Sequence, residues 1–104
     1  MFNEMDLEKQ FHKDMVGIYE KAKNDCGYIA TRFIQMVAEK GGLATAKDLI
    51  IKDEDTYGFE RLYELKRLDL SIEALVLEDK YKNLFTSLEK KRCKDRLKKY
   101  GYYK

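Results

Sequence analysis

The chain has 104 residues, of which 44% are hydrophobic and 38% charged, and its formal net charge is +2. This length suits a single domain, expected to span residues 1–104, and the hydrophobic content excludes a disordered chain. No apolar run approaches the roughly 18 residues of a membrane-spanning helix, and because its start is acidic and amphipathic we do not expect a signal peptide.

Proline is absent and glycine is scarce, which favours helices joined by short turns. We therefore expect an all-α fold: a compact bundle of five or six short helices, with a long first helix and a basic last helix. Cys26 and Cys93 lack metal-ligand spacing and the chain has one His, so we expect no metal and no cofactor. Two unpaired thiols are typical of the cytoplasm.

The first predicted element is a helix over residues 3–25. Gly27 suits its C-terminal turn, and Gly17 within it suggests close approach of another helix. We interpret His12, beside the apolar stripe, as a structural histidine rather than a catalytic one. The stripe consists of Leu7, Phe11, Met15, Ile18, Ala22 and Cys26, at spacings of three and four.

Residues 28–51 predict a helical hairpin around which the other segments are organised. Its first helix should be buried over more than half its circumference, with Phe33 fully buried. We expect Gly41 to close that helix in the left-handed conformation and Gly42 to keep the turn tight. The apolar positions of the hairpin are Ile29, Ala30, Phe33, Ile34, Met36, Val37, Leu43, Ala46, Leu49 and Ile50.

A polar loop follows, and Asp55 or Thr56 can cap a helix over residues 57–66. A short turn then leads to a further helix capped by Ser71 or Asp69. The segment 79–85 is expected to be irregular or a single turn. The apolar residues of the two helices are Phe59, Leu62, Tyr63, Leu65, Ile72, Leu75 and Val76, and the residues of segment 79–85 predicted to point inward are Tyr81, Leu84 and Phe85.

The last helix is predicted from a capping box of Thr86 and Glu89, and runs to about Tyr100. Gly101 should have a positive φ, so that Tyr102 folds back on Leu97. Its thin apolar stripe is Leu88, Cys93, Leu97 and Tyr100. Residues 86–104 hold eight basic and two acidic residues, against 13 basic and 17 acidic residues in 1–85. The chain is thus an acidic body with a basic tail.

Four strings together resemble a widespread, uncharacterised bacterial helical domain that occurs alone or attached to larger proteins, including nuclease-like ones. They are FHKDMVGIYEKAKNDCGYIATRFIQMV, EKGGLATAKDLI, GFERLYELKRLDLSIEALVLE and RLKKYGY. The resemblance covers nearly the whole chain. It implies no particular activity and no catalytic residues, and its nuclease association hints only at a nucleic-acid context.

The preferred functional hypothesis is a protein-interaction or accessory module that binds another protein or a copy of itself. The alternative is weakly specific nucleic-acid binding, in which the basic helix contacts phosphates and tyrosines stack on unpaired bases. The candidate contacts for either partner are Lys91, Lys94, Lys98, Arg92 and Tyr102, with Tyr100 and Tyr103 as further stacking residues.

We do not expect an enzyme, and no Ser, Cys or carboxylate pattern near His12 suggests a nucleophile. Arg32, on the apolar helix, can form a polar site with Asp69 or Glu64, and a core ion pair is the simpler interpretation. The polar residues to inspect are therefore Arg32, Arg67 and Asp69.

Overall fold

The computed structural model describes residues 4–52 and 57–102, and all regular structure within them is helical. This confirms the predicted fold class. The α-helices are α1 (Glu4–Cys26), α2 (Thr31–Lys40), α3 (Gly42–Ile50), α4 (Tyr57–Glu64), α5 (Ile72–Val76) and α6 (Ser87–Lys99). Two 3₁₀-helices, η1 (Leu68–Leu70) and η2 (Asp79–Leu84), flank α5. The segment 79–85 is therefore more regular than expected.

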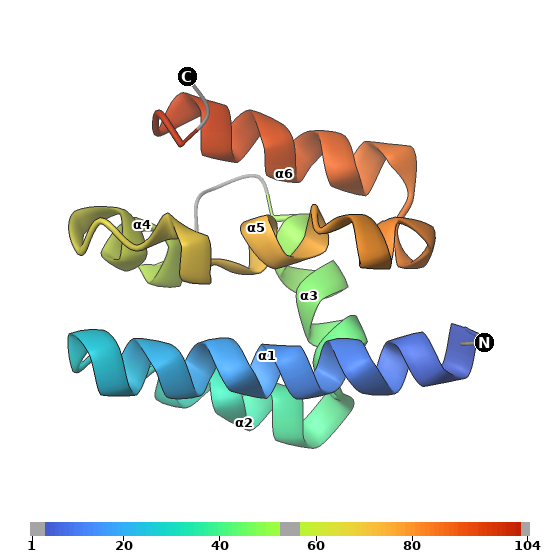
Figure 1. The fold of residues 1–104 in the computed structure, drawn as a ribbon, viewed down its shortest axis with the longest axis horizontal. Helices are drawn as coiled ribbons and strands as arrows, with labels where there is room; N and C mark the ends of the chain where they lie inside the picture. Colours follow the sequence, from blue (N-terminus) through green and yellow to red (C-terminus); the bar gives the residue numbers. More distant parts are fainter. Residues whose placement is uncertain (1–3, 53–56, 103–104) are drawn as a thin grey trace.

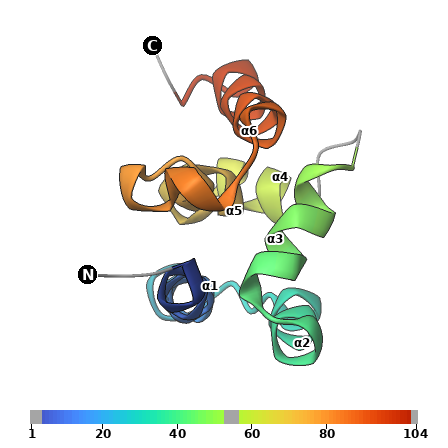
Figure 2. The same cartoon turned by 90° about the vertical axis from the view of Figure 1, so that its right-hand side faces the viewer.

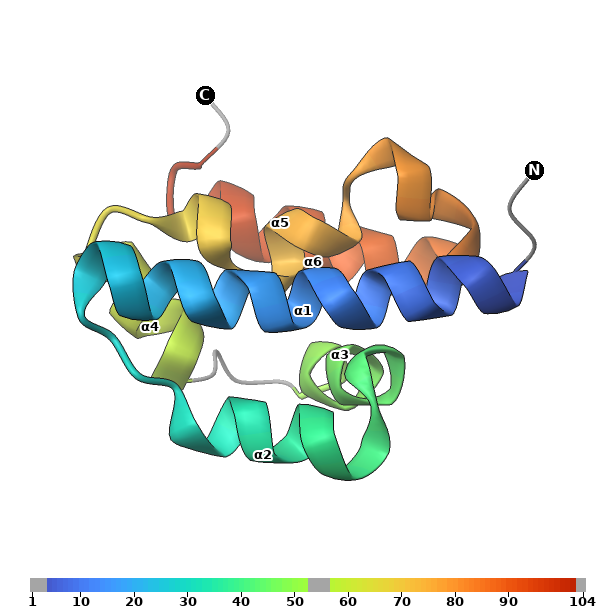
Figure 3. The same ribbon diagram turned by 60° about the horizontal axis from the view of Figure 1, so that its bottom comes forward.

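The helices form three tiers (Figure 1). Helices α1 and α2 make one outer tier, α6 makes the other, and α4 and α5 with the 3₁₀-helices lie between them. Helix α3 crosses the tiers, as the end-on view in Figure 2 shows, and it packs against α1, α2, α5 and α6. In Figure 3, α2 and α3 lie on the same side of α1. Helix α3, rather than the apolar helix before it, is therefore the hub of the fold.

The larger part of the core surrounds Phe11, in the middle of α1. Phe11 is fully buried and meets the rings of Tyr81 and Phe85 edge to face, with centroids 5.0 and 5.3 Å apart. Such pairs add to the free energy gained from burial alone. Met15, one turn further along α1, is also fully buried. The apolar stripe predicted for the first helix is thus confirmed.

Helix α2 is less buried than the sequence predicted. Val37 is its only buried residue, Phe33 is half-buried, and Ile29 just before the helix is 55% exposed. The prediction that Phe33 is fully buried was wrong. The physical reason is that α2 lies at the edge of the fold and packs on α1 and α3, which leaves one flank of its wide apolar stripe uncovered.

The glycines at the α2–α3 junction act differently from expectation. Gly41 has φ 89° and ψ 160°, an extended mirror-image conformation that is essentially restricted to Gly, rather than the left-handed helical one. Gly42 begins α3, and a Cβ there would lie 2.7 Å from the Cα of His12. Close approach of a neighbouring helix therefore occurs at Gly42. It does not occur at Gly17, where a Cβ would meet nothing within 4 Å.

The predicted helix ends are largely confirmed. Ser71 accepts a hydrogen bond from the backbone of α5, Thr86 and Glu89 form the capping box of α6, and Gly27 and Gly101 both have positive φ. The N–H of Tyr102 donates to the carbonyl of Leu97 at 2.9 Å, which closes α6 as predicted. The proposed caps Asp55 and Thr56 lie outside the described residues, as do Asn3 and Tyr103.

The buried face of α6 differs from prediction at two positions. Leu88 is 65% exposed, whereas Arg96 is only 8% exposed. Leu88 precedes Cys93 by five residues, which turns it about 140° away from that residue around the helix. It therefore lies outside the face formed by Cys93 and Leu97, both of which are fully buried.

Candidate functional site

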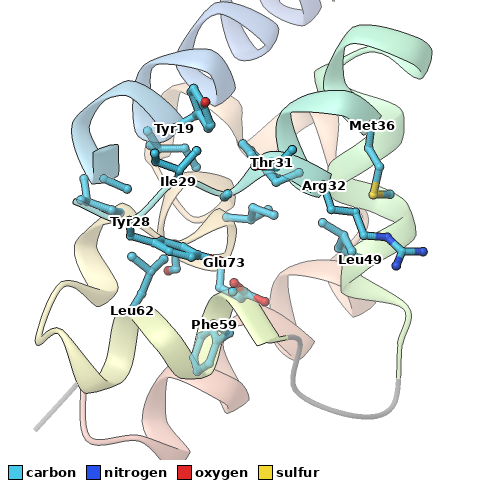
Figure 4. Close-up of a pocket in the computed structure, with 18 of the residues that line it drawn as sticks. Tyr19, Tyr28, Ile29, Thr31, Arg32, Met36, Leu49, Phe59, Leu62 and Glu73 are labelled. Atoms are coloured by element: carbon cyan, nitrogen blue, oxygen red, sulfur yellow. The ribbon is translucent and has the colours of Figure 1, made fainter. Parts of the chain in front are cut away.

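An open cavity of about 850 Å³ lies between the α1–α2 tier and the middle tier (Figure 4). We call it the apolar groove. It is lined mainly by hydrophobic side chains, and its volume is within the range of ligand-binding pockets. Its apolar walls include Ile18 and Ala22 of α1, Phe33 of α2, Phe59 and Leu62 of α4, and Ile72 of α5.

The turn between α1 and α2 shapes one end of the groove. Gly27, with φ 67°, ends α1, and the N–H of Tyr28 then donates to the carbonyl of Ala22 at 3.1 Å. This reversal brings Tyr28 and Ile29 into the wall. In Figure 4, Tyr28 and Leu62 lie at one end of the groove and Arg32 at the other. The groove therefore has an apolar end and a basic end.

A buried ion pair lies behind the groove. Arg96 donates to Glu73 at 3.0 Å, and the side chains are only 9% and 5% exposed. The same guanidinium donates to the carbonyls of Leu49, Ile50 and Lys52, at the C-terminal end of α3. Arg96 thereby satisfies carbonyls that the helix itself leaves without partners. The negative charge of Glu73, which lines the groove, is neutralised by this arginine.

The cations at the rim are in a different situation. Arg32 and Lys52 both line the groove and are exposed. Across residues 4–52 and 57–102, no ion pair involves the side chain of either one. The described walls of the groove thus carry positive charge that no neighbouring carboxylate neutralises.

The three polar residues singled out from the sequence do not form one site. Arg67 donates twice to Asp69, at 3.1 and 3.3 Å, and once to Asp25 at 3.2 Å. This partly exposed cluster ties η1 to the end of α1. Arg32 lies elsewhere, on the groove, and the structure brings it together with neither Asp69 nor Glu64.

The candidate contacts on α6 fall into two groups. Lys94 and Lys98 are exposed, and exposed Lys91 pairs with Asp95 at 2.9 Å, which lowers the pKa of that carboxyl group. Arg92 faces α3 instead. Its guanidinium donates to the carbonyls of Ile50 and Ile51, both at 3.1 Å, and of Lys52 at 3.4 Å. The lysines face solvent, whereas Arg92 holds two helices together.

The cysteines and carboxylates offer little for chemistry or metal binding. Cys93 is fully buried, and burial together with the nearby charge of Glu73 raises the pKa of its thiol to about 12. In the described part of the chain, no three His, Cys, Asp or Glu side chains cluster closely enough to hold a metal ion. What the groove itself provides is apolar surface and positive charge.

Sequence reasoning missed the groove because its walls come from distant segments. Ile29 and Phe33 were recognised as apolar, but an apolar stripe looks the same whether it packs in the core or lines a groove. Phe59 and Leu62 oppose them from α4, and nothing in their local sequence indicates which partner they face. Only the exposed fraction of α2 distinguishes these possibilities.

Compared with protein-family models, with curated proteins and with solved structures, the chain gave no match in any of the three. Among the helices of the described residues, none combines the length and the apolar character needed to cross a membrane.

Proposed function

We propose that this domain is a protein-interaction module that binds an apolar segment of a partner protein in the apolar groove. The observation that carries the proposal is the open, apolar cavity of about 850 Å³, whose apolar surface continues onto Ile29, 55% exposed at the rim. Covering such a surface removes apolar area from water, which is the main source of free energy in protein association.

The charges of the groove define the chemistry of the partner. Arg32 and Lys52 are not neutralised within the described residues, whereas Glu73 is paired with Arg96. A complementary segment therefore carries apolar anchors beside at least one acidic side chain. An amphipathic helix lying in a groove is the common form of such recognition. The free thiols of Cys26 and Cys93 support a reducing compartment, such as the cytoplasm.

Selection from a displayed library of random peptides tests this proposal. We expect the wild-type domain to enrich acidic, amphipathic peptides, and the variant Ile29→Glu to lose them. Arg32→Glu should weaken binding of the same peptides, and this variant should regain affinity when the acidic residue of the peptide is changed to Lys. Tyr102→Ser, outside the groove, is the matched control and should bind as the wild type does.

If the selected peptides bind Ile29→Glu as tightly as the wild type, the groove is not the docking site. Light scattering measures the oligomeric state and so tests whether a second copy of the chain occupies the groove instead. A dimer that Ile29→Glu dissociates would identify a second copy as the occupant and exclude a separate partner protein.

A second candidate function, weakly specific nucleic-acid binding, rests on the exposed face of α6. Lys94 and Lys98 lie one turn apart there, and neither forms an ion pair with a described residue. Lysines spaced in this way can contact successive phosphates without reading bases.

A further inference from the structure

Three tyrosines from two helices meet at one end of the molecule. They surround a hollow of about 270 Å³. Its lining includes Tyr63 of α4, Tyr100 and Tyr102 at the end of α6, and also Lys66 and Asp69. We call it the aromatic hollow. The rings of Tyr63 and Tyr100 meet edge to face with centroids 4.8 Å apart, yet Tyr63 is 48% exposed and Tyr102 40% exposed. The hollow shares none of its residues with the apolar groove.

The rings are held in place from behind. Tyr100 also packs edge to face on buried Phe59, with centroids 4.9 Å apart, so the aromatic contacts continue into the core. Tyr102 is positioned by its backbone, since its N–H closes the last turn of α6 on Leu97. Rings that are supported in this way present aromatic surface to solvent without first having to become ordered.

Lys66 is the unusual residue of this site. The N–H groups of Lys66 and Arg67 donate to the carbonyls of Tyr63 and Leu62, at 3.0 and 2.8 Å, and close α4 with the pattern that Gly101 gives α6. Lys66 stands where Gly is preferred and has φ 62°, the only positive φ of a non-glycine residue in the described chain. This conformation costs free energy that Gly would not. A strained residue at an open site suggests that the site requires its side chain.

The electrostatics of the hollow favour an anion. Lys66 is exposed, and Lys99 lies over the ring of Tyr100, 5.8 Å from its centroid. The one carboxylate in the lining, Asp69, already accepts two hydrogen bonds from Arg67. The exposed lysines of α6 continue this positive charge along the helix.

We propose that the aromatic hollow binds single-stranded nucleic acid, with an unpaired base stacking on Tyr102 beside Tyr63 and Lys66 contacting a neighbouring phosphate. Stacking on aromatic rings combined with a basic track is the usual way in which proteins hold single strands. A duplex has no unpaired base to offer these rings. An acidic peptide could meet the lysines but would bring no flat aromatic surface to the exposed rings.

Fluorescence anisotropy with a short fluorescein-labelled oligothymidylate tests this proposal. We expect the wild-type protein at low salt to bind the single strand more tightly than a duplex of equal length. Tyr102→Ser should weaken binding at least about fivefold, the least that one stacked base contributes, whereas Tyr102→Phe keeps the ring and the affinity. A thermal melt of each variant confirms that the fold is unchanged.

Lys66→Gly gives the sharper test, because its two effects run in opposite directions. Removing the strain should raise the denaturation midpoint, while losing one phosphate contact should weaken binding and flatten the log–log salt slope by about 0.7. A purely structural Lys66 would show the first effect without the second.

Absence of single-strand binding at low salt would overturn the proposal, and so would preference for duplex. Wild-type affinity in both Tyr102→Ser and Lys66→Gly would overturn it as well. None of these results depends on the apolar groove.

Discussion

The Nδ1 atom of His12 accepts a hydrogen bond from the backbone N–H of Gly42 at 2.9 Å, which joins the middle of α1 to the first turn of α3. The first N–H groups of a helix have no partner within it, so a side chain from α1 here caps α3. Nδ1 can accept only in a neutral imidazole whose proton is on Nε2. The contact also brings the two backbones together, because the missing side chain of Gly42 leaves room for the Cα of His12.

The first prediction concerns this contact. Gly42→Ala should lower the free energy of unfolding by about 1–3 kcal/mol, because its Cβ would lie 2.7 Å from a backbone atom of α1. Gly17→Ala is the matched control: a Cβ there meets nothing, so the substitution should stabilise α1 by about 1 kcal/mol. Urea denaturation measures both. Equal effects of the two substitutions would show that the α1–α3 contact does not exclude a Cβ at position 42.

The second prediction concerns the end of α6. Gly101 has φ 79° and a Cβ would meet nothing within 4 Å, so Gly101→Ala tests backbone strain alone. We expect it to destabilise the protein by about 1 kcal/mol in urea denaturation. An unchanged midpoint would mean that the final turn contributes nothing to global stability and opens independently of the rest.

Such helix ends could be predicted from the sequence because they are encoded by neighbouring residues. Ser71, the capping box of α6 and the positive φ of Gly101 all depend on side chains within one or two turns. Arg96 shows where this reasoning stops. In the sequence it is one more cation on a basic helix, whereas in the structure it is buried against carbonyls that lie 44 to 47 residues away along the chain.

The candidate site was harder to predict for a related reason. The apolar character of Ile29 and Phe33 was evident, but their exposure depends on how α4 packs opposite α2. Tyr102 was identified, while Tyr63 and Lys66 were not associated with it, because only the packing of α4 against α6 brings them together. Local sequence encodes the helices, and long-range packing decides which of their faces remain open.

The third prediction concerns the buried ion pair. Arg96→Met should destabilise the protein by about 3–5 kcal/mol, because it removes the guanidinium that pairs with the buried carboxylate of Glu73. The double variant Arg96→Met/Glu73→Leu should recover part of that loss. The recovery should be incomplete, since the hydrogen bonds from Arg96 to the carbonyls of Leu49 and Ile50 are not replaced, although Arg92 still donates to that of Ile50. Strictly additive losses in this double-mutant cycle would indicate that the two side chains are not coupled.

The fourth prediction concerns pH. Burial acts to raise the pKa of Glu89, but the backbone N–H of Thr86 and the ammonium of Lys47 outweigh it and hold the pKa below its usual value of 4.5. The unfolded chain therefore takes up this proton first on acidification. The stabilisation is full above about pH 4.5 and is lost as the pH falls through the lower folded-state pKa.

Denaturation at a series of pH values checks this sign. The difference in unfolding free energy between the wild type and Glu89→Gln should shrink as the pH falls from neutral to about 3. Glu20→Gln, at an exposed position of α1, controls for the loss of one negative charge. A difference that grows on acidification would mean that burial dominates the environment of Glu89.

The last prediction separates the two proposed binding surfaces. Changing Lys91, Lys94 and Lys98 together to Gln should barely alter stability, because all three are exposed and the one ion pair lost, with Asp95, lies on the surface. If these lysines extend the track from the aromatic hollow, the log–log salt slope for single-strand binding flattens by about 0.7 per lost contact, at most about 2. Peptide binding in the apolar groove should be unaffected.

A matched variant makes the comparison specific. Changing Lys9, Lys13 and Lys23, exposed on α1, to Gln removes the same net charge from another face and should leave the salt slope nearly unchanged. Equal flattening in both variants would mean that overall charge, rather than the face of α6, attracts the strand. If the α6 variant loses peptide binding and the wild type binds no oligonucleotide, the peptide docks on α6 and not in the groove. Docking in the groove and docking on α6 therefore predict opposite effects of the same three lysine substitutions on peptide binding.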